Sequence, residues 1–195
     1  MATVAELLGA AKQHYRAGRH ELATECLREA LRQSPDIPGG HNHLGVLLAE
    51  QGRLSEAVAS FREAVRLKPA YAEAHSNLGK ALRQQSQLEA AVSSLQEALR
   101  LRPDFALAHY NLGLAWQQLG KSAEAIGSYQ QALRLRPDCL PAHNNLGIAL
   151  FKQGKLDEAV ASFRQALSLK PDFVQAHYNL GKVLQEQGKL EEAVA

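Results

Sequence analysis

The chain has 195 residues, of which 46% are hydrophobic and 22% charged, and this composition is ordinary for a soluble folded protein. Its formal net charge of +2 gives no general argument for binding nucleic acid or an anionic membrane. Cys26 and Cys139 lie too far apart in sequence to suggest a disulfide framework. The sequence shows no signal peptide, and no apolar run approaches the roughly 18 residues of a membrane-spanning helix, so we expect a cytoplasmic protein.

One pattern recurs every 34 residues along the whole chain. A proline marks it at each interval, at Pro35, Pro69, Pro103, Pro137 and Pro171. The repeats are 4–37, 38–71, 72–105, 106–139, 140–173 and an incomplete 174–195. No insertion breaks the register, and a fixed interval of this length is typical of repeat architectures in which stacked neighbours share a core. The sequence therefore predicts a single array over residues 1–195.

Within a repeat the pattern predicts two helices of about 14 residues and a tight turn. In 106–139, apolar residues recur at spacings of three and four on both sides of Gly120. Glycine is favoured just past a helix end because it tolerates a positive φ, and Pro137 stops the second helix. Gly113 lacks bulk where the two helices would approach at roughly 8–10 Å. Larger side chains such as Tyr129 are expected to fill the space around it.

The two ends of the array and one turn depart from this pattern. Repeat 4–37 has Ala11 where the other repeats have glycine, which is typical of a terminal repeat. Ser86 replaces the turn glycine of repeat 72–105, and we expect this to lower local stability. The last repeat, 174–195, ends inside its second helix. This suggests either a fragment of a longer protein or an open end that pairs with another copy.

The repeated columns resemble the tetratricopeptide repeat family over nearly the full length. The residues that carry the resemblance are, in one repeat, Ala108-His109-Tyr110-Asn111-Leu112-Gly113 with Gly120, Ala125, Tyr129, Ala132 and Pro137. The resemblance implies an all-α fold, a right-handed superhelical solenoid of stacked antiparallel helix pairs whose first helices line the concave face. It also implies a protein–protein interaction scaffold that holds an extended peptide in its concave groove, and not an enzyme.

A column of asparagines is the first candidate contact line. Its members are Asn77, Asn111, Asn145 and Asn179, with His43 in the equivalent place. An amide offers one acceptor and two donors, enough to pair with a peptide backbone without reading its sequence. With first helices about 10 Å apart and an extended chain advancing about 3.3 Å per residue, four asparagines would hold about nine to twelve residues. The column resembles the asparagine ladder in the repeat domain of O-linked N-acetylglucosamine transferase. The alternative is that the amides bond the neighbouring repeat.

Further candidates share the first helices with these asparagines. Beside the column lie Tyr110, Asn144 and Tyr178, and basic residues on the same side include Lys80, Arg83 and Lys182. The expected concave charges lean basic, with Lys12, Arg16 and Lys152 also present against Glu50, Glu73 and Glu186. This balance favours an acidic partner segment. No Lys or Arg occupies the asparagine column, so we do not expect a dedicated carboxylate clamp.

Other columns have simpler interpretations. Histidines recur at His41, His75, His109, His143 and His177, but about 10 Å between repeats is too far for a zinc centre, so we expect half-buried packing residues. Arginines recur near the ends of the second helices at Arg32, Arg66, Arg100 and Arg134, and the first three follow a glutamate by three residues, which favours ion pairs over nucleic acid binding. No catalytic motif occurs, and the sequence predicts no catalytic residue, metal or cofactor.

Two alternatives to an independent scaffold remain open at this stage. The chain could be the substrate-recognition region of a larger enzyme, such as a glycosyltransferase, and the incomplete last repeat motivates that hypothesis. It could also be a self-assembling scaffold, in which the open end at 174–195 docks on another copy.

Overall fold

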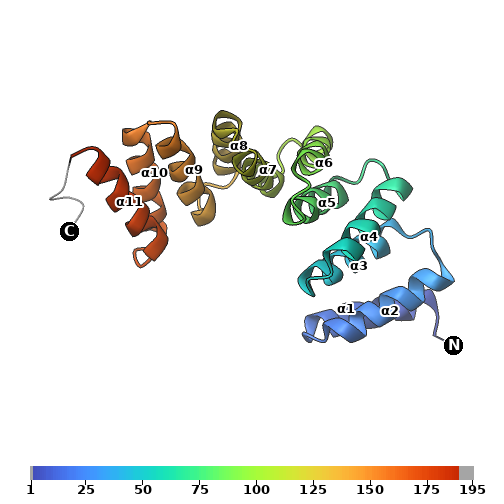
Figure 1. Ribbon diagram of the computed structural model, residues 1–195. Coiled ribbons are helices and arrows are strands. Elements are labelled where there is room, and N and C mark those ends of the chain that lie inside the picture. Colours follow the sequence, from blue (N-terminus) through green and yellow to red (C-terminus); the bar gives the residue numbers. More distant parts are fainter. Residues whose placement is uncertain (1, 189–195) are drawn as a thin grey trace. The chain divides into compact units, whose positions relative to one another are not determined.

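The computed structural model describes residues 2–188, and over that range it contains eleven α-helices and no strand (Figure 1). The helices are α1 (Val4–Arg16), α2 (His20–Gln33), α3 (Pro38–Glu50), α4 (Leu54–Leu67), α5 (Ala72–Gln84), α6 (Leu88–Leu101), α7 (Ala106–Gln118), α8 (Ser122–Leu135), α9 (Leu140–Lys152), α10 (Leu156–Leu169) and α11 (Val174–Glu186). The predicted all-α class and helix lengths are confirmed.

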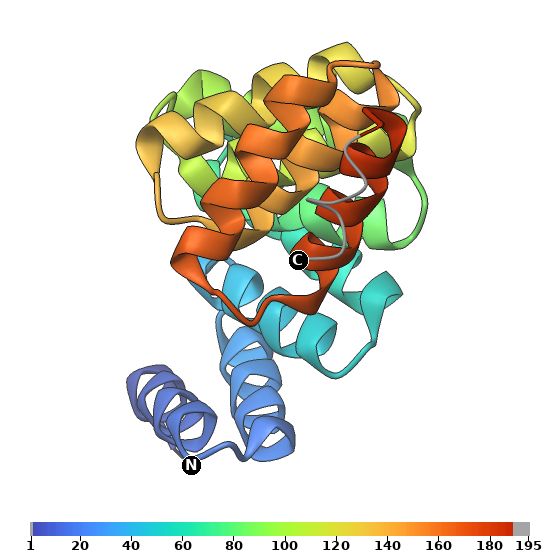
Figure 2. The ribbon, with the colours of Figure 1, turned by 90° about the vertical axis from the view of Figure 1, so that its left-hand side faces the viewer.

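The chain forms two compact units, Met1–Pro103 and Asp104–Ala195. In the N-terminal unit, α1 packs against α2, α3 against α4 and α5 against α6, and α2 also contacts α3 as α4 contacts α5. The C-terminal unit repeats this arrangement from α7 to α11, and Figures 1 and 2 both show α9, α10 and α11 side by side. Each unit is therefore a solenoid of stacked helical hairpins. The single array predicted over residues 1–195 stays a prediction.

The turns inside the hairpins depend on a positive φ. Gly120 has a φ of 74°, and the amide of Lys121 then donates to the Trp116 carbonyl oxygen at 2.9 Å. Ser86 adopts the same conformation with a φ of 60° and is the one non-glycine residue with positive φ in the described range. A side chain with a Cβ is strained there, which agrees with the lower local stability expected from the sequence.

In three of the hairpins an aromatic ring packs against a glycine, at Gly45, Gly113 and Gly147, while Gly79 faces Leu95. A Cβ placed on Gly113 would lie 2.5 Å from a Tyr129 ring carbon, and Tyr129 is fully buried. The same substitution at Gly147 would bring a Cβ within 2.7 Å of the Phe163 ring. The predicted role of Gly113 is therefore confirmed, because only glycine lets the second helix bring its aromatic side chain against the first.

Histidines of the repeated column form hydrogen bonds with the loop that joins successive repeats. His41 Nε2 lies 2.7 Å from the Pro35 carbonyl oxygen, and His75 Nε2 lies 2.9 Å from that of Pro69. His143 and His177 make the same contact with the prolines six residues before them. His41, His75 and His143 are half-buried as expected, whereas His177 is exposed, and each of the four bonds the backbone just before the helix that carries it.

The two ends of the chain are described to different extents. Thr3 caps α1 by accepting from the Glu6 amide, and the Glu6 carboxylate accepts from the Thr3 amide at 2.8 Å. This reciprocal capping fixes the start of the first repeat. The predicted ending of the sixth repeat within its second helix falls on residues 189–195, which lie outside the described residues.

Candidate functional site

In the N-terminal unit, the predicted contact residues lie on two neighbouring first helices. His43 is on α3, while Asn77, Lys80 and Arg83 are on α5, and these two helices contact each other. Asn77 Nδ2 donates to the Asn42 side-chain oxygen at 3.0 Å. The asparagine-column amide therefore bridges to the preceding repeat, which is the alternative that the sequence left open.

Asn42 extends this bridge to the start of α5. Its amide nitrogen donates to the Tyr71 hydroxyl at 3.5 Å, and the Lys68 ammonium lies 5.0 Å from the Tyr71 ring centre. Burial raises the pKa of Tyr71, and the charge of Glu73 raises it further. Asn42 is 5% exposed, so its role is to hold Asn77 in place. The sequence analysis missed it, although it occupies the same repeat position as Tyr110 and Asn144.

The C-terminal unit contains two bridges of the same kind. Asn145 Nδ2 on α9 donates to the Tyr110 hydroxyl on α7 at 3.1 Å. Asn179 Nδ2 on α11 donates to the Asn144 side-chain oxygen on α9 at 3.2 Å. Asn111 is 4% exposed and Asn144 8%, so both lie within the helix packing. Asn145 and Asn179 are half-buried and keep one amide hydrogen and the amide oxygen beyond these bonds.

Exposed groups stand next to these amides on α11. Tyr178 is 66% exposed, and the Lys182 ammonium lies 5.4 Å from its ring centre. An aromatic ring with a cation over it offers both apolar area and positive charge to a ligand.

The acidic residues expected among the first helices of the N-terminal unit have partners within that unit. Glu50 accepts from the Tyr15 hydroxyl at 3.1 Å and lies 3.2 Å from His20 Nδ1, and this hydrogen bond raises the pKa of Tyr15. Glu73 pairs with Arg102 at 2.7 Å. Basic side chains on the same helices remain exposed: Lys12, Arg16 and Lys80. Arg102 offsets the charge of Glu73, whereas a hydroxyl partner leaves the charge of Glu50 in place, so the three exposed cations outnumber the acidic charge that remains.

Three arginines of the second helices, Arg32, Arg66 and Arg100, are paired as predicted. Glu29 accepts two bonds from the Arg32 guanidinium, and these lower the pKa of Glu29 to about 2. The matching pairs are Glu63–Arg66 and Glu97–Arg100. Their positive charge is balanced three residues away, which confirms the interpretation as ion pairs.

A groove of about 730 Å³ lies between α1 and α3, beside the predicted contact residue His43. Gly9 and Gly39 also line it. Gly9 occupies the repeat position that holds His43 on α3 and Asn77 on α5, so the first repeat has no side chain where its neighbours have one. The sequence shows a glycine in this column, but the sequence analysis did not predict a groove, because a missing side chain does not suggest a contact.

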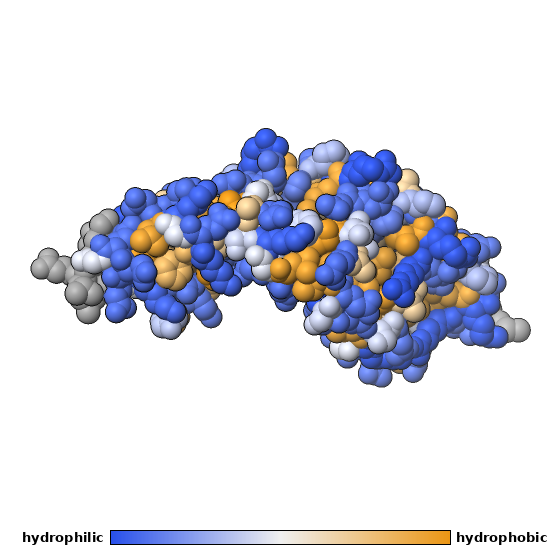
Figure 3. All heavy atoms as spheres, turned by 45° about the horizontal axis from the view of Figure 1, so that its top comes forward, coloured by the Kyte–Doolittle hydropathy of each residue, from blue (hydrophilic) through white to orange (hydrophobic). Residues whose placement is uncertain are grey.

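The surface in Figure 3 is mostly hydrophilic, with hydrophobic residues reaching it in small strips. Over residues 2–188, no group of three or more His, Cys, Asp or Glu side chains is placed to hold a metal ion. None of the described helices has both the length and the apolar character needed to cross a bilayer.

Comparison with known families decides the classification. A family model described as "TPR repeat" matches residues 47–85, 79–120 and 149–188, and one described as "Tetratricopeptide repeat" matches residues 106–139. The chain belongs to the tetratricopeptide repeat (TPR) family. No curated protein sequence matches this TPR chain.

Solved structures support the same assignment. MamA is 28% identical with a TM-score of 0.77, over 83% of this chain and 94% of MamA. TTC0263, a thermophilic TPR protein of Thermus thermophilus, is 26% identical with a TM-score of 0.69, over 94% of this chain and 100% of its own. YrrB, described as a TPR protein with an unusual peptide-binding site, is 24% identical with a TM-score of 0.75, over 87% and 88%. TPR repeats and TPR neighbours support a protein-interaction scaffold, an architecture typical of non-catalytic proteins.

Proposed function

We propose that this TPR chain binds an extended, acidic segment of a partner protein along the first helices of its repeats. The observation that carries this proposal is the charge pattern of the N-terminal unit. Glu73 is paired with Arg102, and Lys12, Arg16 and Lys80 project exposed from the first helices, where they outnumber the carboxylate of Glu50. A surface of one sign raises the local concentration of an oppositely charged segment and orients it.

The bridged amides supply the second part of the proposed contact. An asparagine whose Nδ2 already donates to the neighbouring repeat has a fixed orientation, so its remaining donor and acceptor can meet a peptide backbone with little loss of entropy. Asn77, Asn145 and Asn179 are the half-buried members that fit this role. Asn111 and Asn144 are buried, and we assign them to supporting the helices.

The exposed groups would then set preference among segments. His43, Lys80, Tyr178 and Lys182 are exposed on first helices, and Tyr110 and Arg83 are half-buried beside them. Peptide binding is described for YrrB, whose likeness to this chain extends to the fold. For this chain, peptide binding is our proposal.

An unbiased peptide selection tests the proposal. A phage-displayed library of random dodecapeptides is selected on the immobilised chain and sequenced before and after. We expect selected peptides to be enriched in Asp and Glu. The variant with Lys12, Arg16 and Lys80 all changed to Glu should lose that enrichment.

The matched control carries the same change in net charge at exposed residues outside the first helices, Arg19, Arg62 and Arg134, each changed to Glu. It should select the same acidic peptides as the unmodified chain. Equal loss in both triple variants, or no acidic enrichment with the unmodified chain, would show that the first helices do not carry this function.

A further inference from the structure

The groove between α1 and α3 differs from the rest of the first-helix surface because it is hollow and apolar. We propose that it is an anchoring pocket, which takes one large apolar side chain of a partner segment whose neighbouring carboxylates pair with Lys12 and Arg16. This inference rests on the proposed function, since it names where and by what chemistry the acidic segment is held.

The walls of the groove suit an aliphatic or aromatic side chain. Leu8, Ile37 and Val46 are half-buried at its sides. Leu27 of α2 and Leu47 of α3, each 3% exposed, close it on the core side. Its volume of about 730 Å³ falls within the range of about 300–1,000 Å³ that is usual for ligand pockets. Binding of an apolar side chain here would remove both that side chain and the groove wall from water, which is favourable.

Two glycines keep the groove open. A Cβ built on Gly9 or on Gly39 meets no heavy atom within 4 Å. These glycines therefore differ from Gly113, whose missing side chain is replaced by the ring of Tyr129. The hairpin packing of the first two repeats does not need a glycine at either position, and the space beside them is free for a ligand.

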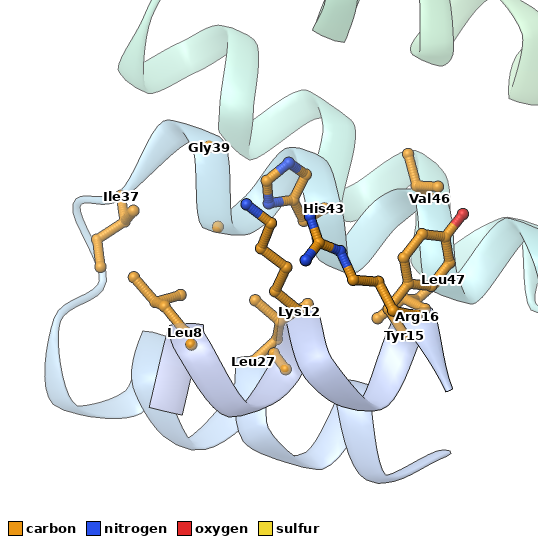
Figure 4. Close-up of a pocket in the computed structure, with 13 residues that line it drawn as sticks. Leu8, Lys12, Tyr15, Arg16, Leu27, Ile37, Gly39, His43, Val46 and Leu47 are labelled. Carbon is orange, nitrogen blue, oxygen red and sulfur yellow. The ribbon is translucent and has the colours of Figure 1, made fainter. Parts of the chain in front are cut away.

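The positive charges of Lys12 and Arg16 at the mouth of the groove favour a partner segment that carries carboxylates. Figure 4 shows the Lys12 and Arg16 side chains extending from α1 across the groove toward His43 of α3. The described residues that line the groove include no Asp or Glu, and the one carboxylate bonded to a lining residue, Glu50 on Tyr15, is outnumbered by the two cations. A purely apolar partner would cover these cations without compensating them, which is costly. A segment with carboxylates on either side of one apolar residue satisfies both features.

The test is a double-mutant cycle between the pocket and the peptide. The peptide is the most frequent one from the dodecapeptide selection, fluorescein-labelled, and its variants change each large apolar residue in turn to Ala. The chain variant is Gly9→Leu, which fills the groove. The control is Gly127→Leu, since Gly127 also lies inside a helix with no heavy atom within 4 Å of its Cβ position, but away from the groove.

We expect Gly9→Leu to weaken the peptide about tenfold to a hundredfold, and one apolar-to-Ala peptide change to do the same. Together they should weaken it little further, because both remove one contact. Gly127→Leu should bind as the unmodified chain does. In methyl NMR spectra, Leu8, Val46 and Leu47 should shift with the intact peptide and much less with its Ala variant.

Several results would overturn the pocket while leaving the proposed function in place. One is an acidic peptide that binds Gly9→Leu and the unmodified chain equally well. Others are methyl shifts at the groove caused by dodecanoate but not by the peptide, or by raising the protein concentration alone, which would assign the groove to an acyl chain or to a second copy. A selection without acidic enrichment would instead remove the proposed function, and the anchor with it.

Discussion

The groove between α1 and α3 contrasts with the neighbouring first helices that side chains bridge, which occur in both units. In the C-terminal unit the gap between neighbouring first helices is spanned by side chains, with Asn145 bonded to Tyr110 and Asn179 bonded to Asn144. Between α1 and α3 the two positions that form such a bridge hold Leu8 and His43, and a groove lies there that Gly9 also lines. A repeat can therefore close this surface with an amide or leave it open for a ligand without altering the hairpin beneath.

Glycine itself has two meanings in this comparison. Gly113 is needed because the Tyr129 ring occupies the place of its side chain, so the second helix can approach. Gly9 has nothing in that place. Both are helical glycines in a regular repeat, and only the position within the repeat separates a packing glycine from one that opens a groove.

The largest effect we expect comes from exchanging these glycines for alanine. Gly113→Ala forces a methyl group against the buried Tyr129 ring, and the strain should lower the free energy of unfolding by about 1–3 kcal/mol. Gly9→Ala should instead raise it by about 0.5–1 kcal/mol, because alanine favours the helix and meets no neighbour. Urea unfolding measures both changes, followed by fluorescence of the single tryptophan, Trp116, for Gly113 and by circular dichroism for Gly9. Effects of equal sign would contradict the distinction.

The bridge between α7 and α9 should show a smaller effect. Removing either partner, with Asn145→Ala or Tyr110→Phe, should lower the free energy of unfolding by about 0.5–1.5 kcal/mol. The double variant should lose little more than one single variant, since the 3.1 Å bond is already broken. Tyr110→Phe keeps the ring near Tyr129, so packing is preserved. Fully additive losses would mean that the bond contributes nothing to the closed surface.

The sequence could predict the hairpins because their rules are local. Turn glycines such as Gly120, stop prolines such as Pro137 and the packing glycine Gly113 each act within one repeat, and the structure confirms what their spacing predicts. Helix pairs with these features need their neighbours only to bury the remaining apolar face.

The candidate site was harder to predict because it depends on which side chains meet between repeats. The sequence placed Asn111 with Asn145 on one contact line, yet Asn111 is buried and Asn145 is bonded to the preceding repeat. The pairing of Glu73 with Arg102 joins residues 29 positions apart, and no spacing rule suggested it. The groove beside Gly9 depends on the distance between two helices, which the repeat pattern does not set.

The turn of the third repeat gives the smallest expected effect and extends the comparison of the units to their loops. The N-terminal unit uses Gly18 and Gly52 in its first two turns but Ser86, at a φ of 60°, in the third, where the C-terminal unit has Gly120 and Gly154. Ser86→Gly should raise the free energy of unfolding by about 1 kcal/mol, because it relieves the clash of a Cβ in the left-handed region. Gly154→Ser is the matched reverse change and should lower it by about the same amount. Urea midpoints from circular dichroism measure both changes. If Ser86→Gly does not raise the free energy of unfolding, the turn accommodates its serine without strain.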